Sequence, residues 1–231
     1  MIKLFPKLKL SPNLVRFAYR FVDLEASGET ASPDARIFEY SFVIGKLNSM
    51  KKGRVLDVGC SARQNFLPAS LASMGWEVYG IDVREFKLRF PNFHFILEDI
   101  TNTNFPDNFF DVVCALSTLE HIGLGGRWGI TSDDPDGDIK AVTQVKRILR
   151  SNGTFLVTVP YGQRKIVGSL HKVYDKFWLS QLFLNWKIEE EIYYIRNHEG
   201  YWEAVPEEVA ALVDNESGEE SIALLELIPL K

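Results

Sequence analysis

Cysteine is scarce in this chain of 231 residues, which contains only Cys60 and Cys114. Two isolated cysteines provide neither a disulfide framework nor a metal site. Disulfides are a feature of oxidising compartments, so their absence favours a reducing compartment. We therefore expect a cytoplasmic location.

Long apolar runs are also missing, and none reaches the ~18 residues that a membrane-spanning helix needs. Residues 1–24 do mix apolar side chains with Lys and Arg, but the charges interrupt the apolar stretch and no small-residue cleavage site follows, which argues against a secretory signal. A basic amphipathic segment of this kind can bind an anionic membrane surface. The interpretation that we favour is a cap packed on the domain, or a homodimer contact.

Positive charge is not in excess either, because the formal net charge is −5. A chain without a basic surplus has no overall field that attracts phosphate backbones. We therefore expect no nucleic-acid partner.

Predicted strands and helices alternate along most of the chain, which is typical of a doubly wound α/β fold with helices on both faces of the sheet. Helices are expected over 67–74 and 139–149, the latter capped by Asp138. Shorter helices are expected over 174–184 and 205–213. Seven strands are expected, over 54–58, 76–81, 93–97, 110–116, 154–159, 186–195 and 222–228.

Residues 1–50 are predicted to form an N-terminal helical cap on a single globular domain that spans residues 51–231. Ser32 and Pro33 provide a helix start, with a hydroxyl as N-cap and proline at the first helical position. The apolar residues that follow recur at helical spacing, so this helix is expected to bury one face. They are Ile37, Tyr40, Ile44 and Leu47.

Two neighbouring strands carry the residues of a nucleoside site. The segment 54–60 (RVLDVGC) is a buried strand that runs into a tight turn, and Gly59 there allows a ligand to approach the backbone. The segment 78–82 (VYGID) is a second strand that ends in Asp82, a carboxylate suited to paired ribose hydroxyls.

With these motifs the chain resembles the class I S-adenosylmethionine-dependent methyltransferases, with motifs like those of the type 11 methyltransferase domain. The resemblance covers roughly residues 53–160. It implies a Rossmann-like sheet of seven mostly parallel strands whose last strand is antiparallel. The motifs are VLDVGC (55–60), YGID (79–82), EDI (98–100), FPDNFFDVV (105–113), LSTLEHIG (116–123) and RILRSNGTFLVTVP (147–160).

The resemblance implies S-adenosylmethionine as cofactor and gives roles to residues at four strand ends. In this reading Asp57 lies near the methionine amino group, Asp82 binds the ribose and Asp99 binds the adenine amine. Leu116 and Ser117 lie beside the methionine part. The implied cofactor-binding residues are Asp57, Gly59, Cys60, Ser61, Asp82, Val83, Asp99, Ile100, Leu116 and Ser117, and Arg36 is added as a partner for the cofactor carboxylate.

The turn after the first strand departs from the family pattern, because Ser61 and Ala62 stand where the family has further glycines. Side chains there narrow the approach to a ligand. The turn either follows another path or binds the cofactor weakly, and we favour another path. For Arg36, a solvated side chain is the alternative to a cofactor contact.

His121 is the leading candidate for a catalytic base, since it follows the fourth strand at the mouth of the site. A structural histidine is the alternative. Tyr161, which follows the fifth strand, is a second catalytic candidate, because loops at the carboxyl ends of strands line the ligand crevice in such folds. His171, Tyr174 and Asp175 are further candidates for contact with the acceptor.

Residues 123–138 form a long segment beside the site, rich in glycine and aspartate. A lid or acceptor wall is expected here, with Arg127 and Trp128 facing an acceptor. The aspartates do not match an EF-hand, because position twelve is Gln144 or Val145 instead of glutamate. No metal site is predicted.

We therefore expect methyl transfer to a small-molecule or saccharide acceptor, at oxygen more than nitrogen. A non-catalytic binding module on the same fold is one alternative, motivated by Ser61 and Ala62. A nicotinamide-dependent oxidoreductase is a second, but no G-x-G-x-x-G run follows the first strand. A lipid acceptor at a membrane surface is the third.

Overall fold

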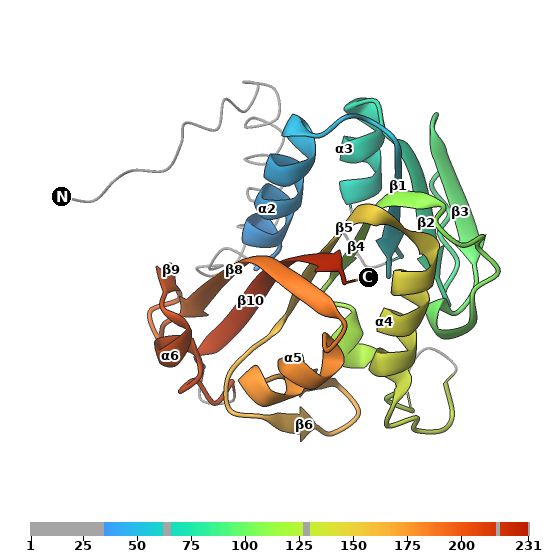
Figure 1. Cartoon of the computed structure of the whole chain (residues 1–231). Helices are drawn as coiled ribbons and strands as arrows, with labels where there is room; N and C mark the ends of the chain where they lie inside the picture. Colours follow the sequence, from blue (N-terminus) through green and yellow to red (C-terminus); the bar gives the residue numbers. More distant parts are fainter. Residues whose placement is uncertain (1–34, 62–65, 127–129, 216–217, 231) are drawn as a thin grey trace.

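The computed structural model describes residues 35–61, 66–126, 130–215 and 218–230. Its main element is an eight-stranded sheet with the strand order β3-β2-β1-β4-β5-β10-β8-β9 (Figure 1). The first five strands in this order are parallel, and β10, β8 and β9 continue the sheet in antiparallel pairs. The strands are β1 (Arg54–Val58), β2 (Glu77–Asp82), β3 (Phe93–Leu97), β4 (Phe110–Leu116), β5 (Leu149–Pro160), β8 (Trp186–Arg196), β9 (Trp202–Val205) and β10 (Glu220–Pro229).

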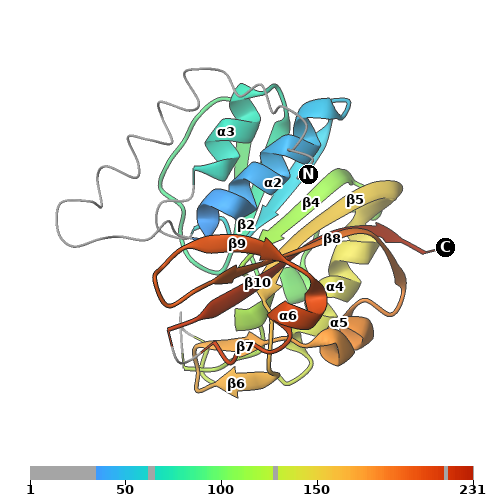
Figure 2. The same ribbon diagram turned by 90° about the vertical axis from the view of Figure 1, so that its left-hand side faces the viewer.

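The expected α/β class, the parallel half and the antiparallel last strand are confirmed, with one strand more than expected in the sheet. Helices cover both faces, with α2 and α3 on one side and α4 and α5 on the other (Figure 2). A separate hairpin of β6 and β7 lies next to α5. The remaining elements are α2 (Arg36–Ser49), α3 (Leu67–Ser73), α4 (Gly137–Ile148), α5 (Lys176–Leu182), α6 (Glu207–Ala210), β6 (Lys165–Val167), β7 (His171–Val173) and the 3-10 turns η1 (Ile100–Asn102) and η2 (Leu119–His121).

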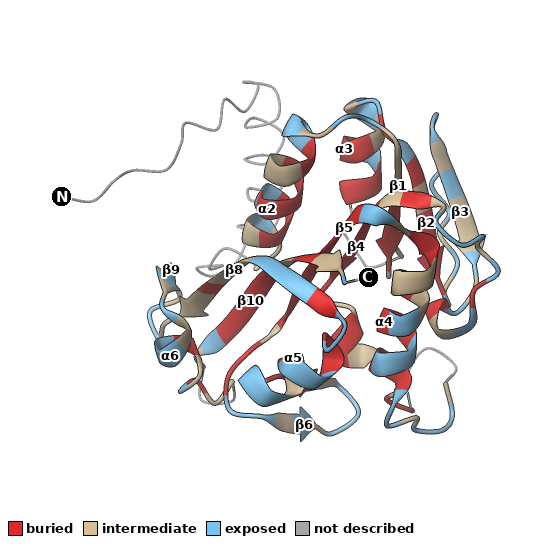
Figure 3. Cartoon of the chain, in the orientation of Figure 1, coloured by how far each residue is buried: buried red, intermediate tan, exposed pale blue. Residues whose placement is uncertain are grey.

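Strand β4 shows why the sequences of the central strands are continuous apolar runs. Val113 and Ala115 pack in the cluster under α4 and α5, whereas Val112 and Cys114 pack in the cluster under α2 and α3. Successive side chains of a strand point to opposite faces, so a strand covered on both faces needs apolar residues at every position. The central strands are accordingly buried along most of their length (Figure 3).

Helix α2 lies on the sheet as expected, but its buried face is rotated from the predicted one. Tyr40, Ile44 and Leu47 are buried, whereas Ile37 is 40% exposed and Glu39 is fully buried. The spacing of apolar residues predicted the buried face of the helix to within one position. The difference arises because the face includes a buried carboxylate, which apolar spacing does not reveal. Ser32 and Pro33 lie outside the described residues, and the helix begins at Arg36 with Ala35 as its N-cap.

The predicted cap of α4 is wrong. Asp136 precedes the helix as its N-cap residue, and Asp138 lies inside the first turn. The Asp138 carboxylate turns inward instead and accepts a hydrogen bond from the Tyr174 hydroxyl at 2.8 Å. The helix also ends one residue early, because Leu149 already pairs with Phe110 as the first residue of β5.

The elements that the sequence did not predict are short. Strand β9 pairs only with β8, at the edge of the sheet, and β6 pairs with β7 over three residues. Strands of three or four residues carry too few positions for an alternating pattern to be read. Over residues 35–61, 66–126, 130–215 and 218–230, no helix has both the length and the hydropathy for crossing a membrane.

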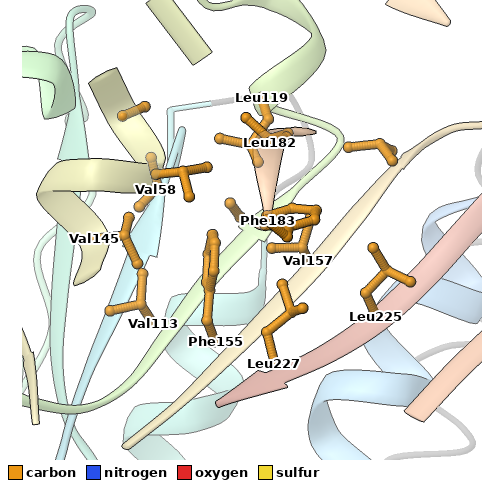
Figure 4. Close-up of a cluster of buried hydrophobic side chains, with 14 of the residues drawn as sticks. Val58, Val113, Leu119, Val145, Phe155, Val157, Leu182, Phe183, Leu225 and Leu227 are labelled. Atoms are coloured by element: carbon orange, nitrogen blue, oxygen red, sulfur yellow. The ribbon is translucent and has the colours of Figure 1, made fainter. Parts of the chain in front are cut away.

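Phe155 tests the core on the α4 and α5 side. Its ring is fully buried, with centroids 5.3 Å from Trp186 and 6.3 Å from Phe183, and it lies among Val113 and Leu227 (Figure 4). Truncation of a buried phenylalanine leaves a cavity, so we expect Phe155→Ala to lower the free energy of unfolding by about 3–5 kcal/mol.

Urea denaturation followed by circular dichroism measures this change. The matched control is Leu184→Ala, since that side chain is 70% exposed and should change stability by less than about 0.5 kcal/mol. Equal effects of the two substitutions would contradict the described core.

Candidate functional site

A cavity of about 200 Å³ opens at the carboxyl ends of the parallel strands. Strands β1, β2, β3 and β4 each contribute the residues at or just after their last position. This is the edge at which doubly wound folds bind their ligands. The lining residues are Arg36, Val58, Gly59, Ile81, Asp82, Val83, Arg84, Glu98, Asp99, Ile100, Thr101, Ser117, Thr118, His121, Ile122, Gly123, Ile130, Ser132, Asp134 and Gly137.

The turn after β1 requires the glycine that the sequence pointed to. Gly59 has a φ of +80°, and a Cβ there would lie 2.5 Å from Oγ1 of Thr118. The Gly59 amide donates to the Ile81 carbonyl at 2.9 Å, which holds the end of β1 beside the end of β2. A glycine here therefore keeps the backbone against the cavity wall.

Ser61 makes its hydrogen bonds to Asp82 and Arg84 of the protein itself. It is not among the described residues with a positive φ, so it needs no glycine-like conformation. Its amide donates to Oδ2 of Asp82 at 2.8 Å and its hydroxyl donates to the Arg84 carbonyl at 3.0 Å. The turn after β1 therefore helps to hold the Asp82 carboxylate in place. Ala62 lies outside the described residues.

Asp82 is buried, and both oxygens of its carboxylate accept hydrogen bonds from Arg84, two residues further along the chain. Arg84 donates from Nε to Oδ1 and from Nη2 to Oδ2, each at 2.9 Å, and its amide also donates to Oδ1. The guanidinium thus binds both carboxylate oxygens with two parallel hydrogen bonds. Two ribose hydroxyls would donate to the same two oxygens. The sequence did not single out Arg84, although its position two residues after the acid was a signal.

Asp99 lines the cavity after β3 with part of its carboxylate open. Its Oδ1 accepts from the amide and the hydroxyl of Thr101, both at 2.8 Å. Its Oδ2 has no hydrogen-bond partner among the residues that the structure describes. Glu98 is turned the other way and binds Asn104 and Thr103, which lowers the pKa of the Glu98 carboxyl through these hydrogen bonds.

A buried carboxylate that the sequence did not reveal, Glu39 on α2, organises the far wall. Its Oε1 accepts from the hydroxyls of Ser117 and Thr158, the latter at 2.6 Å, and its Oε2 accepts from Arg36 at 3.0 Å. Arg36 also donates to the Leu116 carbonyl at 2.9 Å. Arg36 therefore lies at the cavity wall, where it binds the protein's own groups, and its contact with the cofactor carboxylate stays a prediction.

His121 reaches the cavity from η2 with a defined orientation. Its Nδ1 lies 2.5 Å from the Leu170 carbonyl oxygen, and since a carbonyl only accepts, Nδ1 carries the proton. Nε2 is then the unprotonated nitrogen of the neutral ring. It lies 3.8 Å from Oε1 of Glu120.

Glu120 is buried, and its Oε2 has no hydrogen-bond partner among the described residues. Burial, reinforced by the nearby Glu39 charge, raises the pKa of the Glu120 carboxyl to about 8. Glu39 and Glu120 thus form a pair of buried acids, and Arg36 lies directly on the first of them. Two neighbouring acids with environments as different as these are typical of sites where protons are transferred.

Several predicted site residues are not part of the cavity lining. Asp57 and Cys60 are buried beneath it, and burial raises the pKa of the Cys60 thiol above its usual range. Leu116 contributes its carbonyl to Arg36. Tyr161 points the other way, since its ring packs at a tilt against that of Tyr193, with centroids 4.7 Å apart, and its hydroxyl donates to Glu207.

The segment 123–138 forms one wall of the cavity, as expected, through Gly123, Ile130, Ser132, Asp134 and Gly137. Arg127 and Trp128 lie outside the described residues. Within the described part of the chain no group of three or more His, Cys, Asp or Glu side chains is arranged to hold a metal ion.

The family model for a methyltransferase domain matches residues 56–157. This range contains the Gly59 turn, Asp82, Asp99 and η2. No curated protein matches the chain.

Solved structures share the fold at low sequence identity. A 1,6-didemethyltoxoflavin-N1-methyltransferase of Burkholderia thailandensis, with bound 1,6-didemethyltoxoflavin and S-adenosylhomocysteine, is 14% identical at a TM-score of 0.56; the match covers 99% of this chain and 94% of that one. An S-adenosylmethionine-dependent methyltransferase of Methanosarcina mazei is 14% identical over 81% and 98%, at 0.55. The YcgJ protein of Bacillus subtilis is 16% identical over 84% and 99%, at 0.54.

The class to which these structures and the matched family point uses S-adenosylmethionine as methyl donor, which is the cofactor that the sequence predicted. The strand order, the Gly59 turn and the acids at the ends of β2 and β3 agree with it. Residues 56–157 thus match the methyltransferase domain, and the chain has the fold of the class I S-adenosylmethionine-dependent methyltransferases.

Proposed function

We propose that this protein transfers a methyl group from S-adenosylmethionine to an oxygen of a small-molecule or saccharide acceptor. The observation that carries the proposal is one cavity lined by the Gly59 turn, by Asp82 and Asp99, and by His121, whose Nδ1 is held by the Leu170 carbonyl. Net charge of −5 argues against a nucleic-acid acceptor. The Burkholderia enzyme, whose structure holds a small heterocycle, supports a small acceptor.

The residues present fit the cofactor. The backbone at Gly59 can lie against the methionine part, and Oδ2 of Asp99 is open to an amine donor such as that of adenine. Asp82 can accept two ribose hydroxyls once the Arg84 side chain turns away, which the half-buried position of Arg84 allows. Ser117 has a φ of +42° and exposes its backbone at the end of β4 beside the same space.

When bound, S-adenosylmethionine supplies an electrophilic methyl carbon on a sulfonium. The protein's own part is to hold the acceptor in line and to remove its proton. His121 is placed for the second task, because the Leu170 carbonyl keeps the proton on Nδ1 and leaves Nε2 as the base. A phenol or a sugar hydroxyl needs such a base more than an amine does, which favours oxygen as the acceptor atom.

Glu120 supports this role. Its carboxyl, 3.8 Å from Nε2, stays mostly protonated at neutral pH and becomes a carboxylate only above a pH of about 8. An ionised Glu120 would stabilise a protonated His121 beside it. Transfer should therefore speed up as pH rises toward 8.

Calorimetric titration with S-adenosylmethionine and with S-adenosylhomocysteine tests the proposal, and we expect micromolar binding of both. Binding would then be followed by a screen of phenols and saccharides for methylated products. A folded protein that binds neither nucleoside would contradict the proposal and favour the non-catalytic module.

Asp82→Asn should weaken S-adenosylmethionine binding by about 10–100-fold. The substitution replaces a charged acceptor by a neutral one, and hydrogen bonds to charged groups contribute about 1.5–3 kcal/mol. Calorimetry measures the change. Asp107→Asn, an exposed acid paired with Arg147 away from the cavity, is the matched control and should leave the affinity unchanged. An unchanged affinity in Asp82→Asn would show that the nucleoside binds elsewhere.

Arg84→Gln should tighten binding of the same nucleoside by about 2–5-fold. Arg84 occupies both carboxylate oxygens in the free protein, and a partly exposed ion pair of this kind is worth up to about 1 kcal/mol. Its removal takes away the competitor for the ribose. Arg89→Gln, on the same exposed loop, is the control. Weaker binding in Arg84→Gln would mean that the arginine contacts the ligand instead.

Glu120→Gln should make the protein more stable than the wild type at pH 9 and about equally stable at pH 5. The folded-state pKa of about 8 lies above the usual value of 4.5, so the folded protein holds the proton between these pH values and the wild type loses stability as pH rises through them. Glutamine mimics the protonated acid at every pH. Each pKa unit corresponds to about 1.4 kcal/mol, so we expect a gain of at least about 2 kcal/mol at pH 9.

Urea denaturation at pH 5, 7 and 9 measures this difference. Glu203→Gln, which changes an exposed carboxylate on β9, serves as control and should give parallel curves. A stability difference that does not change with pH would refute a proton held at Glu120.

A further inference from the structure

A second cavity, of about 580 Å³, lies on the other side of η2 between α4, α5 and the β6–β7 hairpin. Figure 1 shows α4 and α5 side by side with β6 next to them. Gly123 lines both cavities, but its contact with the first turn of α4 closes the wall between them: a Cβ on Gly123 would lie 2.1 Å from the Asp134 carbonyl and 3.2 Å from Gly137. The second cavity is therefore distinct from the proposed nucleoside site.

The walls of this second cavity are largely apolar and partly open to solvent. Ile139, Ile166 and Phe177 line it and are 46%, 54% and 57% exposed. Trp178 and Leu124 complete the walls. Apolar side chains gathered around a cavity of this size are typical of a small-molecule site.

The floor of the second cavity is polar and buried. Lys172 on β7 and Asp138 on α4 form an ion pair, with Nζ and Oδ2 2.9 Å apart and with 5% and 8% of their side chains exposed. The Tyr174 hydroxyl donates to the same oxygen at 2.8 Å. Oδ1 of Asp138 accepts from the Ile139 amide at 3.0 Å.

These contacts leave the ammonium group short of acceptors. Both oxygens of Asp138 are used, and Asp138 is the one polar partner that Lys172 has among the described residues. An ammonium carries three N–H donors, and buried donors without acceptors are costly. A ligand that fits this floor therefore brings an acceptor oxygen.

Charged side chains of both signs lie at the second cavity, and Lys172 is the cation that lines it. The Asp138 charge is compensated by Lys172, and the Asp133 carboxylate at the edge accepts from the Gly125 amide at 2.7 Å. A second cation near this cavity, Arg164, lies over the rings of Phe177 and Trp178, 5.5 Å and 5.4 Å from their centroids, and pairs with Asp175 at 3.8 Å. Lys172 on the floor is therefore the group that would bind an anionic oxygen, because hydrogen bonds between two charged groups are stronger than neutral ones.

We propose that this second cavity is a binding site for a small aromatic carboxylic acid. The ring lies between the aromatic side chains of α5 and the aliphatic side chains of α4 and β6, and the carboxylate accepts hydrogen bonds from Lys172. The site goes beyond the proposed methyl transfer, and its occupancy is measurable without turnover.

The test is calorimetric titration of the full chain with 2-naphthoate, and with its neutral analogue 2-naphthamide, at pH 7. We expect the carboxylate to bind at least 10-fold more tightly than the amide and to bind equally well with S-adenosylhomocysteine present. The proposal would be overturned if the acid and the amide bound equally, or if 2-naphthoate did not bind at millimolar concentration. It would also be overturned if saturating S-adenosylhomocysteine displaced 2-naphthoate.

Two neighbouring positions on α5 provide a matched pair of variants that avoid the buried ion pair. Gln181 lines the second cavity and Ser180 does not, although both are exposed. Gln181→Trp should fill the opening and weaken 2-naphthoate binding at least 5-fold, whereas Ser180→Trp should leave it unchanged. An effect of the same size in both variants would overturn the proposal.

Lys172→Met tests the floor directly. It should remove the preference for the acid over the amide while the amide still binds. Circular dichroism and titration with S-adenosylhomocysteine verify that each variant is folded. If a folded Lys172→Met protein kept the full preference for the acid, the assignment of Lys172 would be wrong.

Discussion

The Glu39 carboxylate joins helix α2 to the ends of two central strands, and much of the ligand-binding edge depends on that junction. It accepts from Ser117 after β4 and from Thr158 in β5, while Arg36 pairs with its second oxygen. A buried charge is stable only when it is paired and hydrogen-bonded, and all of these partners lie within reach. The same contacts fix Ser117 in its left-handed conformation, with its amide donating to the hydroxyl and the carbonyl of Thr158.

Electrostatic competition then divides the acids of this edge into two kinds. Glu39 and Asp82 each have an arginine within hydrogen-bond distance, whereas no arginine of the described residues pairs with Glu120, whose pKa is raised by burial. The edge of the cavity thus holds two acids paired with arginine beside a third acid, Glu120, whose pKa is raised to about 8. A group with such a raised pKa is typical of sites for proton transfer.

The sequence predicted what depends on local patterns. Apolar runs located the central strands, and the order of Gly59, Asp82 and Asp99 located the edge at which the cavity opens, because the carboxyl ends of parallel strands meet there. Asp138 was misassigned as a helix cap, since its partners Lys172 and Tyr174 are more than thirty residues away along the chain. Glu39 was not predicted for the same reason, because its partners Ser117 and Thr158 are even further away along the chain.

Ser61 and Tyr161 show a related limit. The residue types at these positions were compatible with ligand contact, but a sequence pattern does not tell which way a side chain turns. Ser61 turned toward Asp82 and Arg84, and Tyr161 turned toward Tyr193 and Glu207. Tertiary contacts, rather than local preferences, decide such orientations.

The position of β10 has a consequence for how the chain folds. It is the last strand along the described chain, yet it lies between β5 and β8 in the middle of the sheet. During synthesis, β1 to β5 can pair as they leave the ribosome, but β5 keeps an open edge and β8 has no link to it until residues 220–229 emerge. An open, apolar strand edge is a template for aggregation. We therefore expect the nascent protein to depend on chaperones until its final strand is made, and the joining of the two halves of the sheet to be its slow folding step.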